Sequence, residues 1–317
     1  MRALAVIRAL WKLARPKGMA LIALLPIIGF SFAFWDHGCL LAWDEAIPRL
    51  ALLGLLWAVP HMGTMWLNAA LDRDEGQVLF GDAAPVPEGI EKYAYATIVL
   101  AVVVAFVAHV GLGACVLGCA ILSVLYSHPR TAWKGHALLG PLANAVGYGV
   151  LSPLGGWLYA ELPPTPRGLA VLCVSVAFIC AAYLAAQAFQ EEEDRARGYR
   201  TLVALRGART TLTVTRALLI VSVVLTIGLA ALGWFPRGVV LSAPAFFAAD
   251  RVLVKWREVP GGGDGTWAAR FFVRLAIAGL MCLAAVSIEF TWGQSQGLPL
   301  GGLGTESGHP TTRVCGG

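Results

Sequence analysis

Two acidic clusters, each at the end of a long apolar run, are the groups in this chain best suited to chemistry. The first lies in 68–76, after the apolar run 50–67, and the second lies in 190–202, after the run 168–186. Of the 19 acidic residues in the chain they hold Asp72, Asp74, Glu75, Glu191, Glu192, Glu193 and Asp194. Carboxylates this close together repel one another unless a cation lies among them. Two such clusters facing each other would therefore make a divalent-metal site for a polyanionic ligand.

Helical spacing places the polar side chains of each cluster on one face. His61, Asn68 and Asp72 recur at intervals that form a single stripe, and Thr64 or Met65 fills the gap between them. A second stripe contains Gln187, Gln190, Glu191 and Asp194. Polar stripes on membrane helices face the interior of the bundle or a water-filled cavity. We expect both stripes to line one cavity.

Oxygen ligands of this kind favour magnesium and a phosphate-bearing substrate. Mg²⁺ usually binds one or two carboxylates and completes its coordination with substrate phosphates and water. The predicted metal ligands are Asn68, Asp72, Gln190, Glu191 and Asp194, with Asp72 and Asp194 as the catalytic pair. The cations predicted to bind a diphosphate are Arg73, Arg130, Lys134 and Arg200. The apolar bundle beyond the clusters suits a long hydrocarbon tail, so the two parts together predict a prenyl diphosphate.

Several polar residues also have a simpler interpretation. Glu192 and Glu193 would more often belong to a solvated loop than to a site. His61 would more often be a hydrogen-bonded interior histidine than a ligand, and the run Gly140-Pro141 with Asn144 indicates a kink or close helix packing. The candidates for lining the cavity and stabilising positive charge are Tyr126, Tyr148, His61 and Asn144.

The composition is that of an all-α integral membrane protein. The chain is 58% hydrophobic and only 14% charged, with a mean hydropathy of +0.70, whereas soluble domains carry about 25% charged residues. A span needs about 20 apolar residues. Runs of roughly that length predict about nine helices, at 18–35, 48–70, 93–110, 112–127, 136–159, 168–188, 212–233, 237–254 and 268–289.

The positions of Lys and Arg predict the orientation of these spans. With nine spans and a cytoplasmic N-terminus, all but four of the 24 basic residues fall on the cytoplasmic side. The four exceptions are Arg49, Arg167, Arg237 and Arg313. The net charge of +5 therefore reflects topology rather than nucleic-acid binding. Spans two and six both end on the cytoplasmic side, so the two acidic clusters reach the same face, as expected of a bacterial inner-membrane protein.

The two ends of the chain have a different character from the bundle. Residues 1–17 place Leu4, Ile7 and Trp11 on one helical face, with basic residues elsewhere. This pattern predicts an amphipathic cytoplasmic helix, with a plain basic flank as the alternative. We expect the transmembrane domain to cover 18–290, and the Gly-, Ser- and Thr-rich segment 291–317 to be a flexible tail.

Taken in order along the chain, four motifs resemble those of the UbiA-type intramembrane prenyltransferases. Arg15-Pro16 opens the first span, and 68–76 is similar to the family's first motif, NDxxDxxxD. Tyr126-Ser127-His128-Pro129, with Lys134 further on, resembles the YSxPPxRxK loop. The stretch 192–202, EEDRARGYRTL, is similar to DxxxD followed by GxxTL. The resemblance spans roughly 15–290 and implies nine helices around a central cavity, with a lateral opening to lipid and Mg²⁺ bridging the diphosphate to both aspartate motifs.

The chain departs from those motifs at several positions. Ala69, Gly76 and Gln190 stand where the family has Asp, and the loop has Arg130 and Ala132 in place of its second Pro and its Arg. Asn68, Asp72, Lys134 and Asp194 keep the family pattern. A shift of metal ligands along the helix, to Asp74, Glu75 or Glu191, could compensate.

The resemblance implies Mg-dependent transfer of a prenyl group to a lipophilic, most commonly aromatic, acceptor within the membrane. The changed motifs leave open a terpene cyclase that acts on a prenyl diphosphate alone. A transporter is a third possibility, but its acidic residues would be expected near mid-membrane in two repeats. Here the acidic residues lie at cytoplasmic ends of spans.

Overall fold

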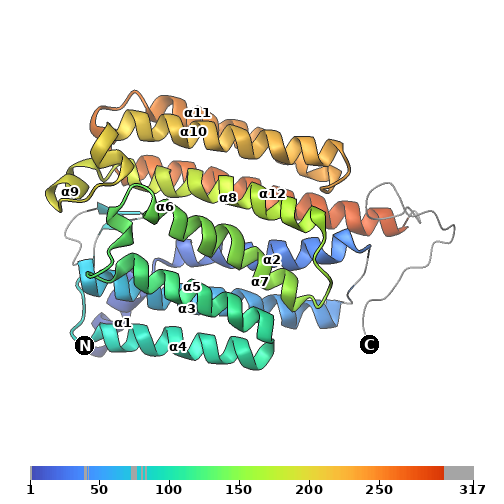
Figure 1. The fold of residues 1–317 in the computed structure, drawn as a ribbon, viewed down its shortest axis with the longest axis horizontal. Helices are drawn as coiled ribbons and strands as arrows, with labels where there is room; N and C mark the ends of the chain where they lie inside the picture. The colour runs from blue at the N-terminus through green and yellow to red at the C-terminus, as the bar shows by residue number, and fades with distance from the viewer. Residues whose placement is uncertain are drawn as a thin grey trace.

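The computed structural model describes residues 2–38, 41, 43–72, 77–79, 81–82 and 84–295. Within them the chain is a bundle of roughly parallel and antiparallel helices (Figure 1). The helices are α1 (Arg2–Leu13), α2 (Pro16–Asp36), α3 (Trp43–Asp72), α4 (Ile90–Ala108), α5 (Val110–Ser127), α6 (Leu139–Asn144), α7 (Ser152–Tyr159), α8 (Pro166–Gln187), α9 (Glu191–Ala196), α10 (Leu202–Ala231), α11 (Ala243–Trp256) and α12 (Gly265–Ser295). The two short strands β1 (Gln77–Val78) and β2 (Gly81–Asp82) pair antiparallel.

Nine helical crossings can be traced through the described residues. Seven are single helices long and apolar enough to cross a membrane, namely α2, α3, α4, α5, α8, α10 and α12. The other two are composite. α6 and α7 are joined without a break by a π-helical segment, Ala145–Leu151, and a 3-10 helix, Arg237–Ser242, leads directly into α11. The predicted all-α membrane fold is thus confirmed, with a count of helical crossings close to the predicted number of about nine.

Close contact between α2 and α7 holds the centre of the bundle together. Gly29 of α2 lies against the backbone of Pro153, and Gly156 of α7 lies against the backbone of Pro26. A Cβ atom at either glycine would overlap a backbone carbonyl. Small residues let membrane helices approach this closely, which is how van der Waals packing replaces the hydrophobic effect inside a bilayer.

The boundaries of the bundle differ slightly from the predicted ones. α12 continues to Ser295, beyond the expected limit at 290, and 296–317 lies outside the described residues. At the other end, α1 packs against α3, where the Trp66 indole donates a hydrogen bond of 2.9 Å to the Leu10 carbonyl. Ile7 and Trp11 on α1 remain exposed.

Candidate active site

A cavity of about 520 Å³ lies between α2, α3, α5, α8 and α12. Its lining includes Asn68 and Asp72 from the end of α3 and Gln190 and Asp194 from the region of α9. These two groups lie more than a hundred residues apart in the chain. The fold therefore brings Asp72 of the first acidic cluster and Asp194 of the second to a single cavity.

The α3 side of this cavity is organised around Lys134. Its ammonium forms an ion pair with the Asp72 carboxylate and lies 3.4 Å from Asn68 Oδ1. The same amide oxygen accepts a hydrogen bond of 3.2 Å from Ser127, which ends α5 and is only 1% exposed. Lys134 belongs to a 3-10 helix, Trp133–Gly135, in the loop between α5 and α6. This loop thus fixes the two polar residues that the α3 stripe points into the cavity.

The opposite side is organised around Asp194, which is 8% exposed. Its Oδ2 accepts a hydrogen bond of 2.6 Å from the Thr201 hydroxyl, and its carbonyl accepts one of 2.9 Å from the Tyr199 amide. Thr201 also caps the N-terminus of α10 by accepting from the Ala204 amide. Gly198, between Asp194 and Thr201 in the chain, has a φ of 70°, a conformation that glycine adopts without steric cost. The run Gly198 to Leu202 therefore forms a tight turn that holds Asp194 in place.

Backbone contacts join the two sides. The Arg200 amide donates a hydrogen bond of 2.7 Å to the Gly135 carbonyl, and His136 and Arg200 form an isolated β-bridge. A Cβ atom on Gly135 would lie only 2.7 Å from the Tyr199 ring. The lysine loop and the turn after α9 therefore pack as one unit, which fixes Lys134 relative to Asp194.

Burial perturbs the ionisation of both charged groups. Burial raises the pKa of the Asp194 carboxyl and Glu193 adds to this, whereas Thr201, Arg197 and Lys134 lower it. Burial also lowers the pKa of Lys134 to about 8, helped by Arg197 and opposed by Asp194. The ion pair with Asp72 further favours the charged ammonium. Partly dehydrated charges of both signs are suited to a ligand that carries a cation and an anion together.

The second acidic stripe differs from the prediction at one position. Gln187, Gln190 and Asp194 line the cavity, but Glu191 does not, and Glu193 does. The reason is that α8 ends at Gln187 and α9 begins at Glu191, so helical spacing does not carry across the intervening turn. Glu191 instead accepts from the Ala208 amide at 2.9 Å and pairs with Arg195 at 2.8 Å.

The predicted cations are also distributed differently. Lys134 lines the cavity, whereas Arg130 and Arg200 are exposed and are not among its lining residues. Arg73 lies outside the described residues, as do Asp74, Glu75 and Gly76. Two arginines that the residue spacing did not single out do line the cavity, Arg15 at the start of α2 and Arg197 after α9. Arg197 also pairs with Glu193 at 2.7 Å, so these two residues act as a unit.

Aromatic and polar side chains continue the lining beyond the charged end. Tyr126 and Tyr183 meet edge to face with ring centroids 6.3 Å apart. His61 Nδ1 lies 3.2 Å from the Tyr148 hydroxyl, and both residues line the cavity. Asn144 lines it as well, and its amide group donates to the Gly140 carbonyl at 3.0 Å.

Three tryptophans, Trp57, Trp66 and Trp157, are not among the residues that line the cavity. Trp57 donates to Ser152 at 2.6 Å, Trp66 to the Leu10 carbonyl, and Trp157 to the Leu162 carbonyl at 3.1 Å. Their indole groups are thus used in packing between and within helices.

The donor set fits a magnesium ion held jointly with a substrate. Among the residues that the structure describes, no group of three or more His, Cys, Asp or Glu side chains forms a metal cage. Instead Asp72, Asp194, Asn68 and Gln190, whose side chains all carry oxygen atoms, line the cavity. Hard oxygen donors in small number, with room for phosphates and water, are typical of Mg²⁺ sites.

A comparison with protein-family models gives a match to the UbiA prenyltransferase family over residues 23–275. The chain belongs to this family. The matched segment includes 68–76, 190–202 and the lysine loop, and the predicted family membership is confirmed. No match was found among curated protein sequences.

Solved structures share the fold of this UbiA family member. A UbiA homolog from Archaeoglobus fulgidus bound to DMAPP and Mg²⁺ has a TM-score of 0.64 at 17% identity, covering 88% of this chain and 99% of that one. The same homolog bound to GPP and Mg²⁺ has a TM-score of 0.63 over the same shares. A digeranylgeranylglyceryl phosphate synthase has a TM-score of 0.58 at 14% identity, covering 90% of this chain and 98% of that one. The protein is therefore an integral membrane protein with a UbiA fold.

Proposed function

We propose that this protein transfers a prenyl group from a prenyl diphosphate to a lipophilic acceptor within the membrane. The observation that carries the proposal is that Asp72 and Asp194, on separate helices, line the charged end of one mostly apolar cavity together with Lys134. The UbiA homolog from Archaeoglobus fulgidus was bound to DMAPP or GPP with Mg²⁺, which supports the same ligands here.

The charged end would bind the diphosphate. Asp72 and Asp194, with Asn68 and Gln190, would hold Mg²⁺, which when bound stabilises the negative charge of the leaving diphosphate. Lys134 would donate hydrogen bonds to the phosphate oxygens as a compact point charge. Arg15 and Arg197 also line the cavity and would supply further positive charge.

The apolar part of the cavity would protect the allylic cation that forms when the carbon–oxygen bond breaks. The rings of Tyr126, Tyr148 and Tyr183 line this region, and aromatic faces attract positive charge. The surrounding apolar walls exclude water, which prevents hydrolysis of the cation.

Polar groups on the α3 and α5 side of the cavity support an acceptor that carries oxygen substituents. Thr64 donates to Ser123 at 3.2 Å, and the His61–Tyr148 pair lies on the same side. Such groups orient a hydroxyl or carbonyl of a ligand, whereas a tail-binding wall needs none. An aromatic acceptor with hydroxyl or carbonyl substituents, such as a quinone precursor, fits this lining.

Product analysis by mass spectrometry tests the proposal. Purified protein with Mg²⁺ and a prenyl diphosphate should form a prenylated product only when an aromatic acceptor is added. Release of a terpene hydrocarbon or alcohol without an acceptor would instead identify a cyclase.

Variants then link the activity to this site. Asp72→Asn and Asp194→Asn should each lower turnover by at least about a hundredfold, since each removes one carboxylate from a charge-stabilising site. Glu192→Gln removes a carboxylate from the same run at an exposed position and should leave turnover unchanged. Full activity of both aspartate variants would refute the assigned site.

A further inference from the structure

The cavity extends well beyond its charged end. Along α8 its lining runs from Gln187 to Val171, and the rise of 1.5 Å per residue makes this distance about 24 Å. Along α2 the lining runs from Gly18 to Phe32, which is about 21 Å by the same rise. The cavity is therefore a channel that follows the helices across most of the bundle.

Mostly apolar side chains form the channel beyond its charged end, with Ser31 and Thr226 among the few polar ones. One face of α12 lines it with Phe272, Leu275, Ala276, Gly279, Cys282, Leu283 and Val286. Val171 and Val174 of α8 lie on another wall. A wall of this composition binds hydrocarbon through its buried area alone.

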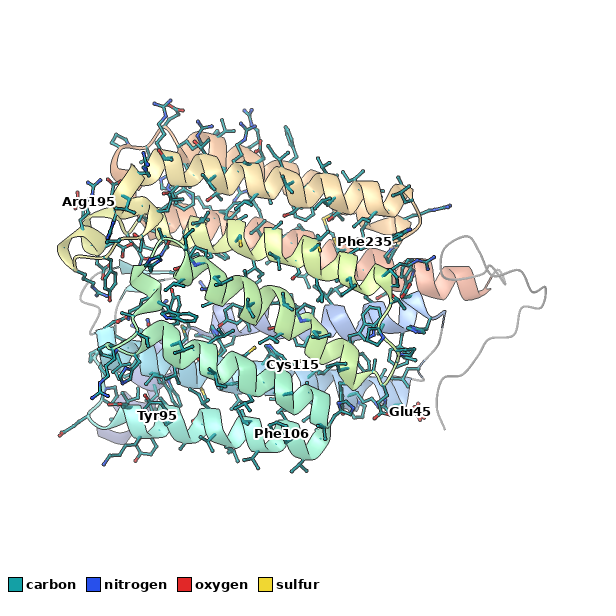
Figure 2. All side chains as sticks on the ribbon, viewed as in Figure 1. Glu45, Tyr95, Phe106, Cys115, Arg195 and Phe235 are labelled. Carbon is teal, nitrogen blue, oxygen red and sulfur yellow. The ribbon has the colours of Figure 1, made fainter. Side chains whose placement is uncertain are left out.

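Two packed phenylalanines lie at the end of the channel that is remote from the acidic clusters. Phe32 and Phe235 line the channel and are only 6% and 7% exposed, and their rings meet edge to face with centroids 5.3 Å apart. Behind them Phe32 packs against Trp35 at 5.1 Å and Trp157 at 5.8 Å. Figure 2 shows Phe235 at the opposite end of the bundle from Arg195, which belongs to the acidic cluster.

We infer that Phe32 and Phe235 form a floor that sets the maximum length of the prenyl tail. The inference rests on the proposed function. Three backbone bonds span 3.8 Å, so the four bonds of an isoprene unit span about 5 Å when extended. A channel of about 24 Å then accommodates about four or five units with the diphosphate at the acidic clusters. Longer tails would have to displace the two rings.

Binding and turnover of a length series test the floor. All-trans prenyl diphosphates of roughly two to eight isoprene units are compared in turnover with Mg²⁺, and their non-hydrolysable thiodiphosphates in thermal-shift binding. For the wild type, kcat/KM should fall by about tenfold or more beyond five units, because a tail that does not fit loses packing at every added carbon. The thermal shift produced by the thiodiphosphates should become smaller at the same length. Phe32→Leu and Phe235→Leu should move this limit to longer tails.

A second variant should shorten the longest accepted tail. It tests the inference even if the substitutions at Phe32 and Phe235 impair folding. Gly279 lies midway along the α12 wall, and its missing Cβ faces open space. Gly279→Phe should therefore block the channel, so that tails of about two units bind as before while tails of about four units lose at least tenfold in kcat/KM.

Phe34→Leu is the matched control. Phe34 lies on the same helix as Phe32 and is 7% exposed, but it does not line the channel. The Phe34→Leu variant should lower stability without moving the length limit.

Two results would overturn the inference. The wild type could accept about eight units as readily as four, which would mean that the tail leaves the bundle sideways, or Phe34→Leu could shift the length limit as much as the floor variants do. If no prenyl diphosphate of any length binds or reacts, the proposed function itself fails.

Discussion

At the scale of single residues, the lysine and the arginine in the loop between α5 and α6 differ in burial. Lys134 is 8% exposed and pairs with Asp72, whereas Arg130 is exposed and does not line the cavity. Both positions carry positive charge at the same end of the bundle. Only the buried charge can form a strong, poorly screened interaction with a diphosphate.

Lys134→Gln should therefore weaken binding of the prenyl diphosphate by at least about tenfold, since hydrogen bonds to charged groups contribute about 1.5–3 kcal/mol. Isothermal titration with a non-hydrolysable analogue and Mg²⁺ measures this loss. Arg130→Gln removes an equal charge from the same loop and should bind as the wild type does. Equal weakening in both variants would point to general electrostatic attraction instead of a defined contact.

Glu191 provides a second prediction at this scale. Its carboxylate accepts from the Ala208 amide and pairs with Arg195, away from the cavity. Glu191→Gln should lower the free energy of unfolding by about 1 kcal/mol, the usual net contribution of such a contact, with an unchanged Mg²⁺ requirement. Denaturation in detergent and a magnesium titration of turnover measure the two effects. A large rise in the Mg²⁺ concentration needed would place Glu191 among the metal ligands.

At the scale of elements, the crossing of α2 and α7 sets the shape of the bundle. Gly29 and Gly156 each lie against the backbone of the other helix, so neither position has room for a side chain. The π-helical segment Ala145–Leu151 precedes α7 and carries Tyr148 into the cavity. Helix packing and site geometry are thus coupled through one composite span.

Gly156→Ala should destabilise the protein by at least about 2–3 kcal/mol, because the added methyl group meets backbone atoms that have no rotamer freedom. The midpoint of thermal unfolding in detergent is the measurement. Gly54→Ala is the control, since a Cβ atom at Gly54 of α3 has nothing within 4 Å. Alanine has a higher helix propensity than glycine, so Gly54→Ala should not destabilise the protein. A stability loss of the same size in both variants would show that the close contact at Gly156 is not responsible.

At the scale of the whole molecule, the ends of the bundle differ in charge and chemistry. The C-terminal end of α3, α9, the lysine loop and α1 lie at one end, and the loop between α7 and α8 lies at the other (Figure 1). The distribution of Lys and Arg predicts that the acidic end faces the cytoplasm. A diphosphate substrate made in the cytoplasm would then reach the site without crossing the membrane.

Cysteine labelling in intact cells tests this orientation. In a background with the native cysteines replaced, Thr131→Cys should be protected from a membrane-impermeant maleimide, and Pro164→Cys should be labelled, since both positions are exposed in the structure. Inverted membrane vesicles should give the reverse pattern. Labelling of Thr131→Cys from outside intact cells would reverse the proposed topology.

The sequence by itself determined the membrane class, an apolar run for each of about nine helices, and a common cavity for Asp72 and Asp194. These features depend on local composition and on helical periodicity, which hold within a single helix. Asn68 and Asp72 lie on one continuous helix, so their spacing predicted their common face correctly.

Only the tertiary structure decided which neighbours of these residues share the cavity. Glu193 rather than Glu191 lines it because the chain turns between α8 and α9, and periodicity does not extend across a turn. Arg197 and the floor residue Phe235 come from helix ends and loops whose direction is set by packing against distant segments. Such long-range contacts leave no period in the sequence, and so only the folded chain reveals them.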